Sequence, residues 1–361
     1  MINQKRLVET FITLAKIDSP SEHEEKFRDY CAEKLKKLGA TIKLDSYGNL
    51  FAYFEGVGEP IMINCHLDTV EPGRDIKPKI KENKIVSDGT TILGGDPKAG
   101  IAALFEALTS LKEDKKQYPA LDIVLTFGEE IGLVGAKHLD YTMLRAKRGI
   151  TFDGEKSVAN VIIGAPGYNQ INVTITGKSA HAGVEPEQGI SAIQIASKII
   201  ANLKLGRIDN ETTANVGLIF GGSARNAVPE NSTFQGEIRS RDKKKLENHT
   251  QHFKDIIKKV QKNYPKAKIE LEIVREFDPY EFSNEHPMIE KIEASLKELK
   301  LKPNLYASGG GTDVNIFQAH GIDAICVGAG SFNMHTKREY VDINELVKTA
   351  KFCELLIKQA N

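Results

Sequence analysis

Two short apolar runs constrain the fold more than any other feature of the chain. Residues 61–65 and residues 121–127 are mainly apolar, and each run ends directly in polar or charged side chains. Runs of this length are typical of strands that are buried on both faces. Residues 99–111 between them predict a helix, which is the usual connection between parallel strands. The pattern therefore predicts an α/β fold with its functional groups at the carboxyl ends of the strands.

The first 55 residues predict two helices and a β-hairpin. Apolar residues recur at helical spacing over residues 7–15. A second helix is predicted to begin at a capping box formed by Ser21 and Glu24 and to end at Gly39. Alternation over residues 41–55 predicts the hairpin.

The character of the sequence changes near residue 168. From there on it predicts strands at residues 171–176, 214–220, 233–240 and 269–275 and helices at residues 189–203 and 242–260. Residues 287–299 and 322–327 then resume the α/β style with a helix and a buried strand. We therefore predict a discontinuous main domain, residues 1–167 and 281–361, with a compact α+β domain, residues 168–280, inserted into it.

The charge balance limits the kinds of partner. The chain has 49 Lys and Arg residues against 49 Asp and Glu residues, so no net field draws it toward nucleic acid or an anionic membrane. Its first residues carry charges within an amphipathic pattern, unlike a signal peptide or a membrane span. We therefore expect a cytoplasmic protein with no nucleic-acid or membrane partner.

The four cysteines lie far apart in the sequence. Cys31, Cys65, Cys326 and Cys353 form no C-x-x-C pair, which argues against a disulfide framework and against a thiolate zinc site. We expect reduced and mostly buried thiols.

Side chains suited to metal binding follow both apolar runs. His66 and Asp68 follow the first run, and their spacing of two places them on one face of an extended backbone, where Asp68 can orient the His66 ring. Glu129 and Glu130 follow the second run, so that one carboxylate can bind metal while the other transfers protons. Asp96, in a glycine-rich turn, can bridge two cations. Such ligands suit a two-zinc hydrolytic site.

In order and context these motifs resemble those of the co-catalytic di-zinc peptidases, a family that includes peptidase T, carboxypeptidase G and aminoacylase. The matching segments are residues 65–69, 87–100, 126–130, 152–154 and 333–335. The resemblance covers nearly the whole chain, and residues 88–94 and 310–313 look most like the peptidase T branch. It implies a catalytic zinc-peptidase domain with a mixed central sheet and flanking helices, and an inserted domain that serves as lid and dimerisation domain.

The resemblance also implies the metal ligands. His66 and Asp153 would bind one Zn²⁺, Glu130 and His335 would bind the other, and Asp96 would bridge the two. Co²⁺ or Mn²⁺ could replace zinc, because histidine and carboxylate ligands discriminate poorly between these ions.

The same resemblance makes Glu129 the general base, which takes a proton from the attacking water and passes it to the leaving amine. The family holds a cis peptide bond after the bridging aspartate. Pro97 occupies that position here, and the cis form is least costly before proline. We therefore predict a cis Asp96–Pro97 bond.

In the inserted domain the resemblance implies three substrate-binding residues, His181, Asn226 and Arg239. The histidine would reach the active site of the other subunit, while the asparagine and the arginine would hold a substrate carboxylate. Arg241 is an alternative to Arg239. A homodimer that forms through the inserted domain is the expected assembly.

The predicted activity is that of a metallopeptidase for short peptides, specifically an aminotripeptidase that releases the N-terminal residue. Glu155 is a candidate partner for the substrate amine. An N-acyl amino acid amidohydrolase or a carboxypeptidase of the same fold would share the metal site, so both remain alternatives. A non-catalytic zinc-binding protein is a weaker one, because it has no need of a proton-transferring residue such as Glu129.

Overall fold

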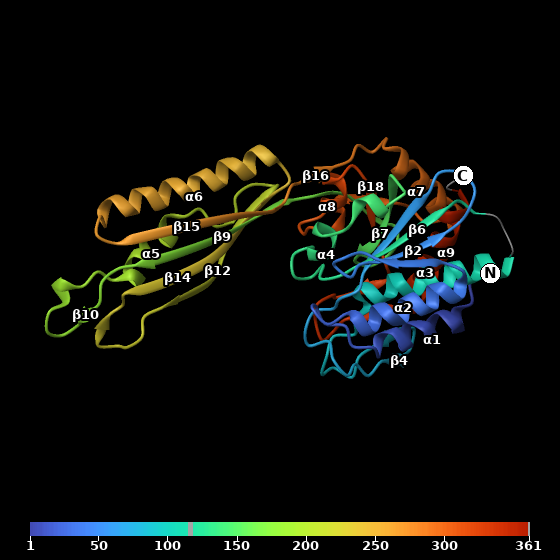
Figure 1. Ribbon diagram of the computed structural model, residues 1–361, viewed down its shortest axis with the longest axis horizontal. Helices are drawn as coiled ribbons and strands as arrows, with labels where there is room; N and C mark the ends of the chain where they lie inside the picture. Colours follow the sequence, from blue (N-terminus) through green and yellow to red (C-terminus); the bar gives the residue numbers. More distant parts are fainter. Residues whose placement is uncertain (115–117, 360–361) are drawn as a thin grey trace. The chain divides into compact units, whose positions relative to one another are not determined.

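The computed structural model describes residues 1–114 and 118–359. Within them the chain forms two compact units (Figure 1). Unit one consists of residues 1–163 and 282–308 and the described residues from 312 onward. Unit two consists of residues 164–281 and 309–311.

A nine-stranded mixed sheet is built mainly by unit one. In order across the sheet its strands are β1 (Thr41–Leu44), β2 (Leu50–Phe54), β6 (Leu121–Thr126), β3 (Ile61–His66), β7 (Arg148–Gly154), β18 (Asp323–Gly328), β8 (Asn160–Ala165) and β16 (Tyr280–Glu281), and β17 (Asn304–Ala307) pairs with β8. The four central strands, β6, β3, β7 and β18, are parallel, whereas β2 and β8 join them antiparallel. All residues of β3 and β6 are buried, as expected of strands covered on both faces. The mixed α/β architecture is the predicted one.

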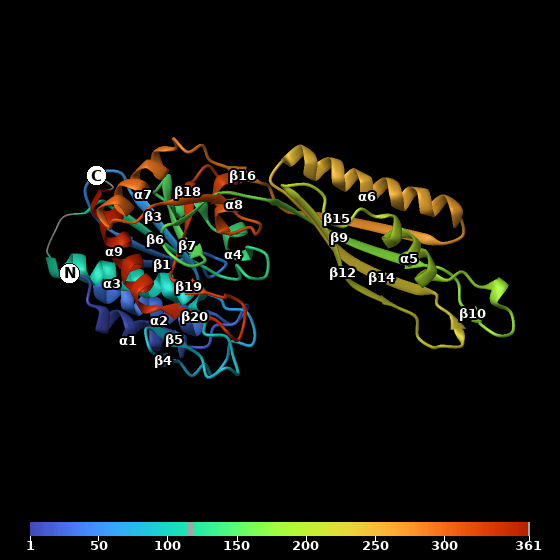
Figure 2. The ribbon, with the colours of Figure 1, turned by 180° about the vertical axis from the view of Figure 1, so that it is seen from behind.

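Helices cover this sheet (Figure 2). They are α1 (Gln4–Ala15), α2 (Glu25–Leu38), α3 (Gly95–Asp114), α4 (Val134–Lys137), α7 (Pro287–Glu298), α8 (Asp313–Ala319) and α9 (Ile343–Gln359), with a 3-10 turn at Tyr141–Met143. The connecting helix α3 is buried along most of its length because it packs against α1, α2 and α9 as well as the sheet.

A second, four-stranded sheet lies in unit one. Its strands are β19 (Ser331–Phe332), β20 (Tyr340–Asp342), β5 (Lys84–Val86) and β4 (Lys79–Lys81), in that order. The loop between β19 and β20 carries His335.

Unit two is an antiparallel sheet with two helices. The strand order is β11 (Gly206–Arg207), β12 (Thr212–Gly221), β14 (Asn231–Ser240), β9 (Gly167–Thr176) and β15 (Lys268–Phe277). The helices α5 (Ala192–Asn202) and α6 (Lys243–Asn263) share one apolar core with this sheet, to which Ile171, Ile195 and Phe253 belong. A two-stranded ribbon of β10 (Ala180–His181) and β13 (Ala227–Val228) and a 3-10 turn at Pro186–Gln188 complete the unit.

Most of the predicted elements are confirmed. The hairpin of β1 and β2 forms, and α2 ends at Gly39, whose φ of 118° lies in the left-handed region that glycine adopts readily. All four cysteines are free and buried, as predicted. None of the helices in the described part of the chain combines the length and apolar character that crossing a membrane requires.

The predicted capping box of Ser21 and Glu24 is wrong. α2 begins at Glu25, and Glu24 takes the N-cap position without a side-chain hydrogen bond to the helix. The Ser21 hydroxyl instead donates to Asp68 (2.6 Å), and the Glu24 carboxylate accepts from the backbone N–H of Gly128 (2.9 Å). Both of these partners are buried, and each is far from α2 in the sequence, so no local pattern reveals the bonds.

Candidate metal centre

The residues with metal-binding side chains come from strand ends and loops of unit one. They are His66 at the end of β3, Asp96 at the start of α3, Glu129 and Glu130 in the turn after β6, Asp153 in β7, and His335 between β19 and β20. The parallel strands β3, β6 and β7 are neighbours, so their carboxyl ends bring these side chains to one edge of the sheet.

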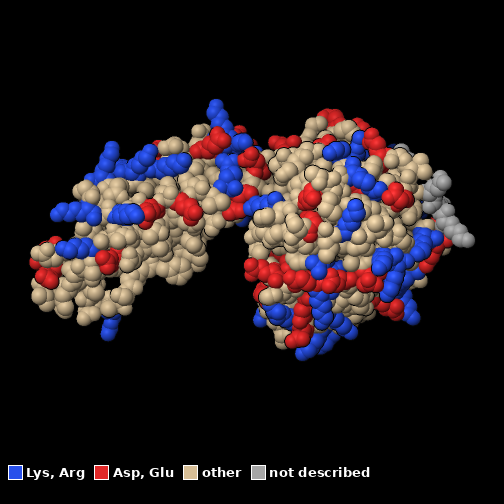
Figure 3. Space-filling model, in the orientation of Figure 1, with Lys and Arg blue, Asp and Glu red and all other residues tan. Residues whose placement is uncertain are grey.

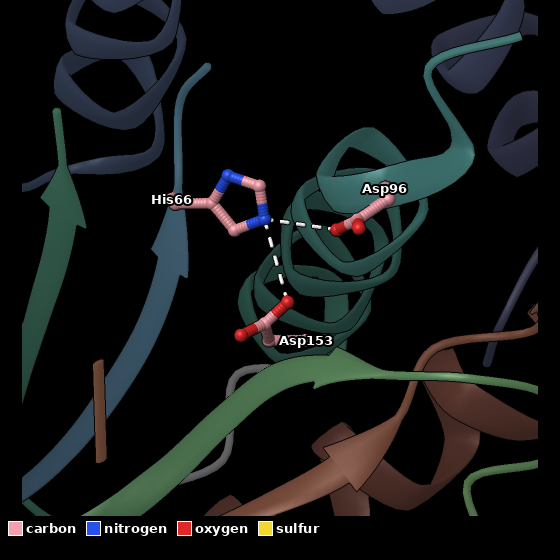
Figure 4. Close-up of side chains that lie close together, drawn as sticks. All are labelled: His66, Asp96 and Asp153. Atoms are coloured by element: carbon pink, nitrogen blue, oxygen red, sulfur yellow. Dashed lines mark hydrogen bonds and ion pairs between the residues drawn. The ribbon is translucent and has the colours of Figure 1, made fainter. Parts of the chain in front are cut away.

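The two histidines meet at one aspartate. His66 Nε2 lies 2.8 Å from Asp96 Oδ1 and 3.4 Å from Asp153 Oδ1 (Figure 4). His335 Nε2 lies 3.1 Å from Asp96 Oδ2 and 2.8 Å from Glu130 Oε1. Asp96 thus offers one oxygen to each histidine.

These donors fit a pair of divalent cations. His66, Asp96 and Asp153 form one group, and Asp96, Glu130 and His335 form another; within each group the ligand atoms lie within 4.8 Å of one another. Imidazole nitrogen and carboxylate oxygen are zinc ligands, and a carboxylate shared between two groups suits a two-metal site.

The pKa shifts in the cluster also favour the binding of cations. Burial and the neighbouring Asp153 raise the pKa of Glu129 well above its ordinary range. Burial, together with Asp96, raises the pKa of Glu130 to about 7. Hydrogen bonds to Asp96 and Glu130 raise the pKa of His335 to about 10. Without cations, therefore, several buried acids resist ionisation, and divalent ions would relieve that repulsion.

The backbone around Asp96 is bound by Glu339, a residue that no sequence motif predicted. Glu339 is 2% exposed, and its carboxylate accepts the backbone N–H groups of Leu93 (2.8 Å), Gly94 (2.9 Å) and Asp96 (3.1 Å). No sequence signal marks it, because it stands among charged residues that read as a solvated loop. The Asp96–Pro97 bond is cis, as predicted.

Asp68 lies on the other side of His66. Its Oδ1 is 3.2 Å from His66 Nδ1, and its two oxygens accept the backbone N–H groups of Glu129 (2.9 Å) and Glu130 (3.1 Å). Asp68 therefore touches both the histidine and the turn that carries the two glutamates.

Asp313, in the segment that resembles peptidase T, is buried near the cluster. It is 1% exposed, and the Thr126 hydroxyl donates to it. Burial raises the pKa of Asp313 to about 7. The motif in this segment predicted no role for Asp313.

The three predicted substrate-binding residues fall into two groups in unit two. His181 and Asn226 lie together, because β10 pairs with β13 and the Ala182 N–H donates to the Asn226 carbonyl (2.9 Å). Arg239 lies in β14, where it stacks on the ring of Tyr168 (4.6 Å) and pairs with Glu237 (3.0 Å).

The two groups are far apart within the unit. The ribbon adjoins the start of β14 at Asn231, since Gly177 N–H donates to the Glu230 carbonyl and Asn231 pairs with Thr176. Arg239 is eight residues farther along the strand, roughly 26 Å at about 3.3 Å per residue. Glu155, the candidate for binding the substrate amine, has a half-exposed side chain 4.0 Å from Lys156.

Comparison with known proteins gives consistent matches. Residues 62–359 match the model of peptidase family M20/M25/M40. An uncharacterised protein of Bacillus subtilis is 38% identical over 371 residues, covering 100% of both chains. Among solved structures, the aminopeptidase PepT from Bacillus cereus has 37% identity and a TM-score of 0.91, covering 99% of this chain and 98% of that one. A tripeptidase from Staphylococcus aureus has 35% identity and a TM-score of 0.94, with the same coverage.

Proposed function

Because this chain belongs to peptidase family M20/M25/M40, we propose that it is a two-zinc aminopeptidase that releases the N-terminal residue of tripeptides. The observation that carries the proposal is the position of Asp96, with one carboxylate oxygen near the buried His66 and the other near the more exposed His335. The similarity to an aminopeptidase and to a tripeptidase, each over almost the full length, supports the substrate class.

In this proposal His66 and Asp153 would hold one ion, Glu130 and His335 would hold the other, and Asp96 would contribute to both, in keeping with the two groups of ligand atoms that share it. When bound, the ions would polarise the scissile carbonyl and make a water molecule in the site easier to deprotonate. Asp68 accepts the Nδ1–H of His66, which leaves Nε2 free to bind metal.

Glu129 is the proposed proton carrier. The residue is 9% exposed, and its carboxylate lies in the cluster with His66 and Glu130. It takes the proton of the attacking water and delivers it to the leaving amine. Bound cations would favour the ionised form of this carboxyl, which is the form that accepts the proton in the first step.

Unit two is the proposed lid and dimerisation domain. The outer side of β12 beyond Ala214 has no strand partner among the described residues, and it exposes Leu218, Ile219 and Phe220. Figure 3 shows a surface with few charges along this edge, in contrast to the lysines along α6. Exposed apolar edge strands invite pairing with a second chain. In a homodimer each chain would also contribute to two active sites, to one through His181 and Asn226 and to the other through Arg239.

The activity is tested on purified, zinc-loaded protein with di-, tri- and tetrapeptides and with N-acetyl amino acids. Release of the N-terminal residue from tripeptides is the expected result. Glu129→Gln should retain two metal ions and lose about 10²- to 10⁴-fold in turnover, whereas Glu130→Gln should lose metal. Cleavage of N-acetyl amino acids without cleavage of tripeptides would contradict the substrate class, and full turnover by Glu129→Gln would contradict the role of Glu129.

A further inference from the structure

The segment of residues 17–24, which joins α1 to α2, lies against the loops of the metal centre. The Ile17 carbonyl accepts from the buried Lys98 ammonium (2.6 Å), and the Ser19 carbonyl accepts from the Thr69 N–H (2.8 Å). The segment precedes residue 62, where the family match begins, so the match assigns it no role.

Glu24 is the last residue of this segment and is fully buried. It is 0% exposed, and its Oε1 accepts the N–H of Gly128 at 2.9 Å. Its Oε2 has no hydrogen-bond partner among the described residues. A buried carboxylate that satisfies only one of its oxygens is a costly way to stabilise a core, and an apolar residue would serve that purpose better. The position of Glu24 therefore calls for a reason other than stability.

The partner of Glu24 supplies that reason. Gly128 has a φ of 55° and begins the turn that carries Glu129 and Glu130. Three successive N–H groups of this turn point at buried carboxylates, that of Gly128 at Glu24 and those of Glu129 and Glu130 at Asp68. Three peptide planes are thereby fixed, the plane before Gly128 by Glu24 and the planes on either side of Glu129 by Asp68. Together these planes set the direction in which the Glu129 side chain leaves the backbone.

We propose that Glu24 is a positioning residue which, together with Asp68, fixes the turn of residues 128–130 and so places the Glu129 carboxylate. The inference rests on the proposed function, because it assumes that Glu129 transfers protons. Ser21 completes the arrangement from the same segment, since its hydroxyl donates to Asp68 at 2.6 Å. Of the two residues that mimic a helix cap in the sequence, Glu24 thus binds the turn directly, and Ser21 binds Asp68, which holds the rest of the turn.

The test compares Glu24→Ala and Glu24→Gln in the full-length, zinc-loaded protein. The glutamine retains an oxygen that can accept from Gly128, so its kcat should stay within about threefold of the parent. The alanine removes the acceptor, so its kcat should fall about 10- to 100-fold while KM and the bound zinc stay unchanged, because small misplacements of a catalytic group cost rate rather than binding. Glu106→Ala is the matched control, since Glu106 is 2% exposed and pairs with Arg6 (2.7 Å) across α1 and α3. It should lower the melting temperature and leave kcat unchanged.

Hydrogen exchange at the Gly128 amide gives a readout that does not depend on activity. Exchange should be faster in Glu24→Ala than in the parent and in Glu24→Gln. Parental exchange in Glu24→Ala would overturn the inference, as would parental kcat, or a Glu24→Gln variant as slow as the alanine. If the parent cleaves no peptide, the proposed function fails, yet faster exchange in Glu24→Ala would still support the positioning role and unchanged exchange would still refute it.

Discussion

At the residue scale, Asp96 explains how one site can hold two ions. Its carboxylate is buried, and its two oxygens are divided between His66 and His335. Although burial opposes ionisation, His66 and His335 hold the pKa of Asp96 at about 2. This carboxylate is therefore charged at neutral pH and ready to bind cations.

Asp96→Asn is expected to weaken the binding of both ions. The amide is neutral and offers only one acceptor oxygen, and even the loss of an outer partner of a metal ligand costs about 10- to 100-fold in affinity. We expect a loss of about 100-fold or more for each ion in competition titrations with a chelator. Asp122→Asn is the matched control, because Asp122 is also buried but pairs with Arg145 (2.8 Å) instead of the cluster. Loss of only one ion in Asp96→Asn would argue against a shared ligand.

The sequence predicts residue identities better than it predicts their surroundings. His66, Asp96 and Glu130 were grouped from motif order, and the structure brings them together; their roles remain predictions. Glu24 was wrongly predicted to cap a helix, and Glu339 was not predicted to have a role. Each forms hydrogen bonds with backbone groups more than 100 residues away in the sequence. No local pattern encodes such a bond, and Glu24 in particular imitates a local one, the capping box.

At the element scale, the long buried strands and helices are the predictable part of the fold. β3 and β6 follow from their apolar runs, and α5 and α6 follow from helical periodicity. The small sheet of β4, β5, β19 and β20 was not predicted, since strands of two or three residues are too short to show a period. That sheet nevertheless carries the His335 loop.

The start of α3 depends on Glu339, which holds three backbone N–H groups. Glu339→Ala would leave these buried donors unpaired, at about 1–3 kcal/mol each. We expect a loss of about 3 kcal/mol or more in the free energy of unfolding, measured with urea, accompanied by weaker metal binding. A loss below about 1 kcal/mol would show that water or a shifted loop replaces the carboxylate.

The edge strand β12 is expected to form the dimer. Phe220 is 60% exposed there, and Phe220→Asp should convert the dimer to a monomer in sedimentation velocity. Val57→Asp, at a position in unit one that is also 60% exposed, should leave the dimer intact. A parent protein that sediments as a fully active monomer would contradict both the dimer and the donation of His181 to a partner.

At the scale of the whole molecule, metal and pH both act through buried acids in and around the cluster. Burial raises the pKa of Glu24, Glu130 and Asp313 to about 7 each, against about 4 in an unfolded chain. Between these values the folded, metal-free protein binds more protons than the unfolded chain. The contribution of these three groups to stability is therefore fully present at about pH 4 and is lost as the pH rises toward 7.

The melting temperature of the metal-free protein should accordingly fall between about pH 5 and pH 7.5. Zinc should reverse this trend, because metal binding requires deprotonated ligands and grows stronger as they lose protons. The gap between zinc-loaded and metal-free melting temperatures should therefore widen across this window in scanning calorimetry. If the melting temperature of the metal-free protein instead rises with pH, the pKa values of these carboxyl groups are not raised in the folded protein.

The central claim is that two metal ions in one cluster support cleavage of short peptides. The most direct test is a titration of metal-free protein with zinc, following both bound metal and release of the N-terminal residue from a tripeptide. We predict that turnover appears with zinc and reaches its maximum at two ions per chain. Turnover that is complete at one ion, or that is the same without metal, would contradict the account.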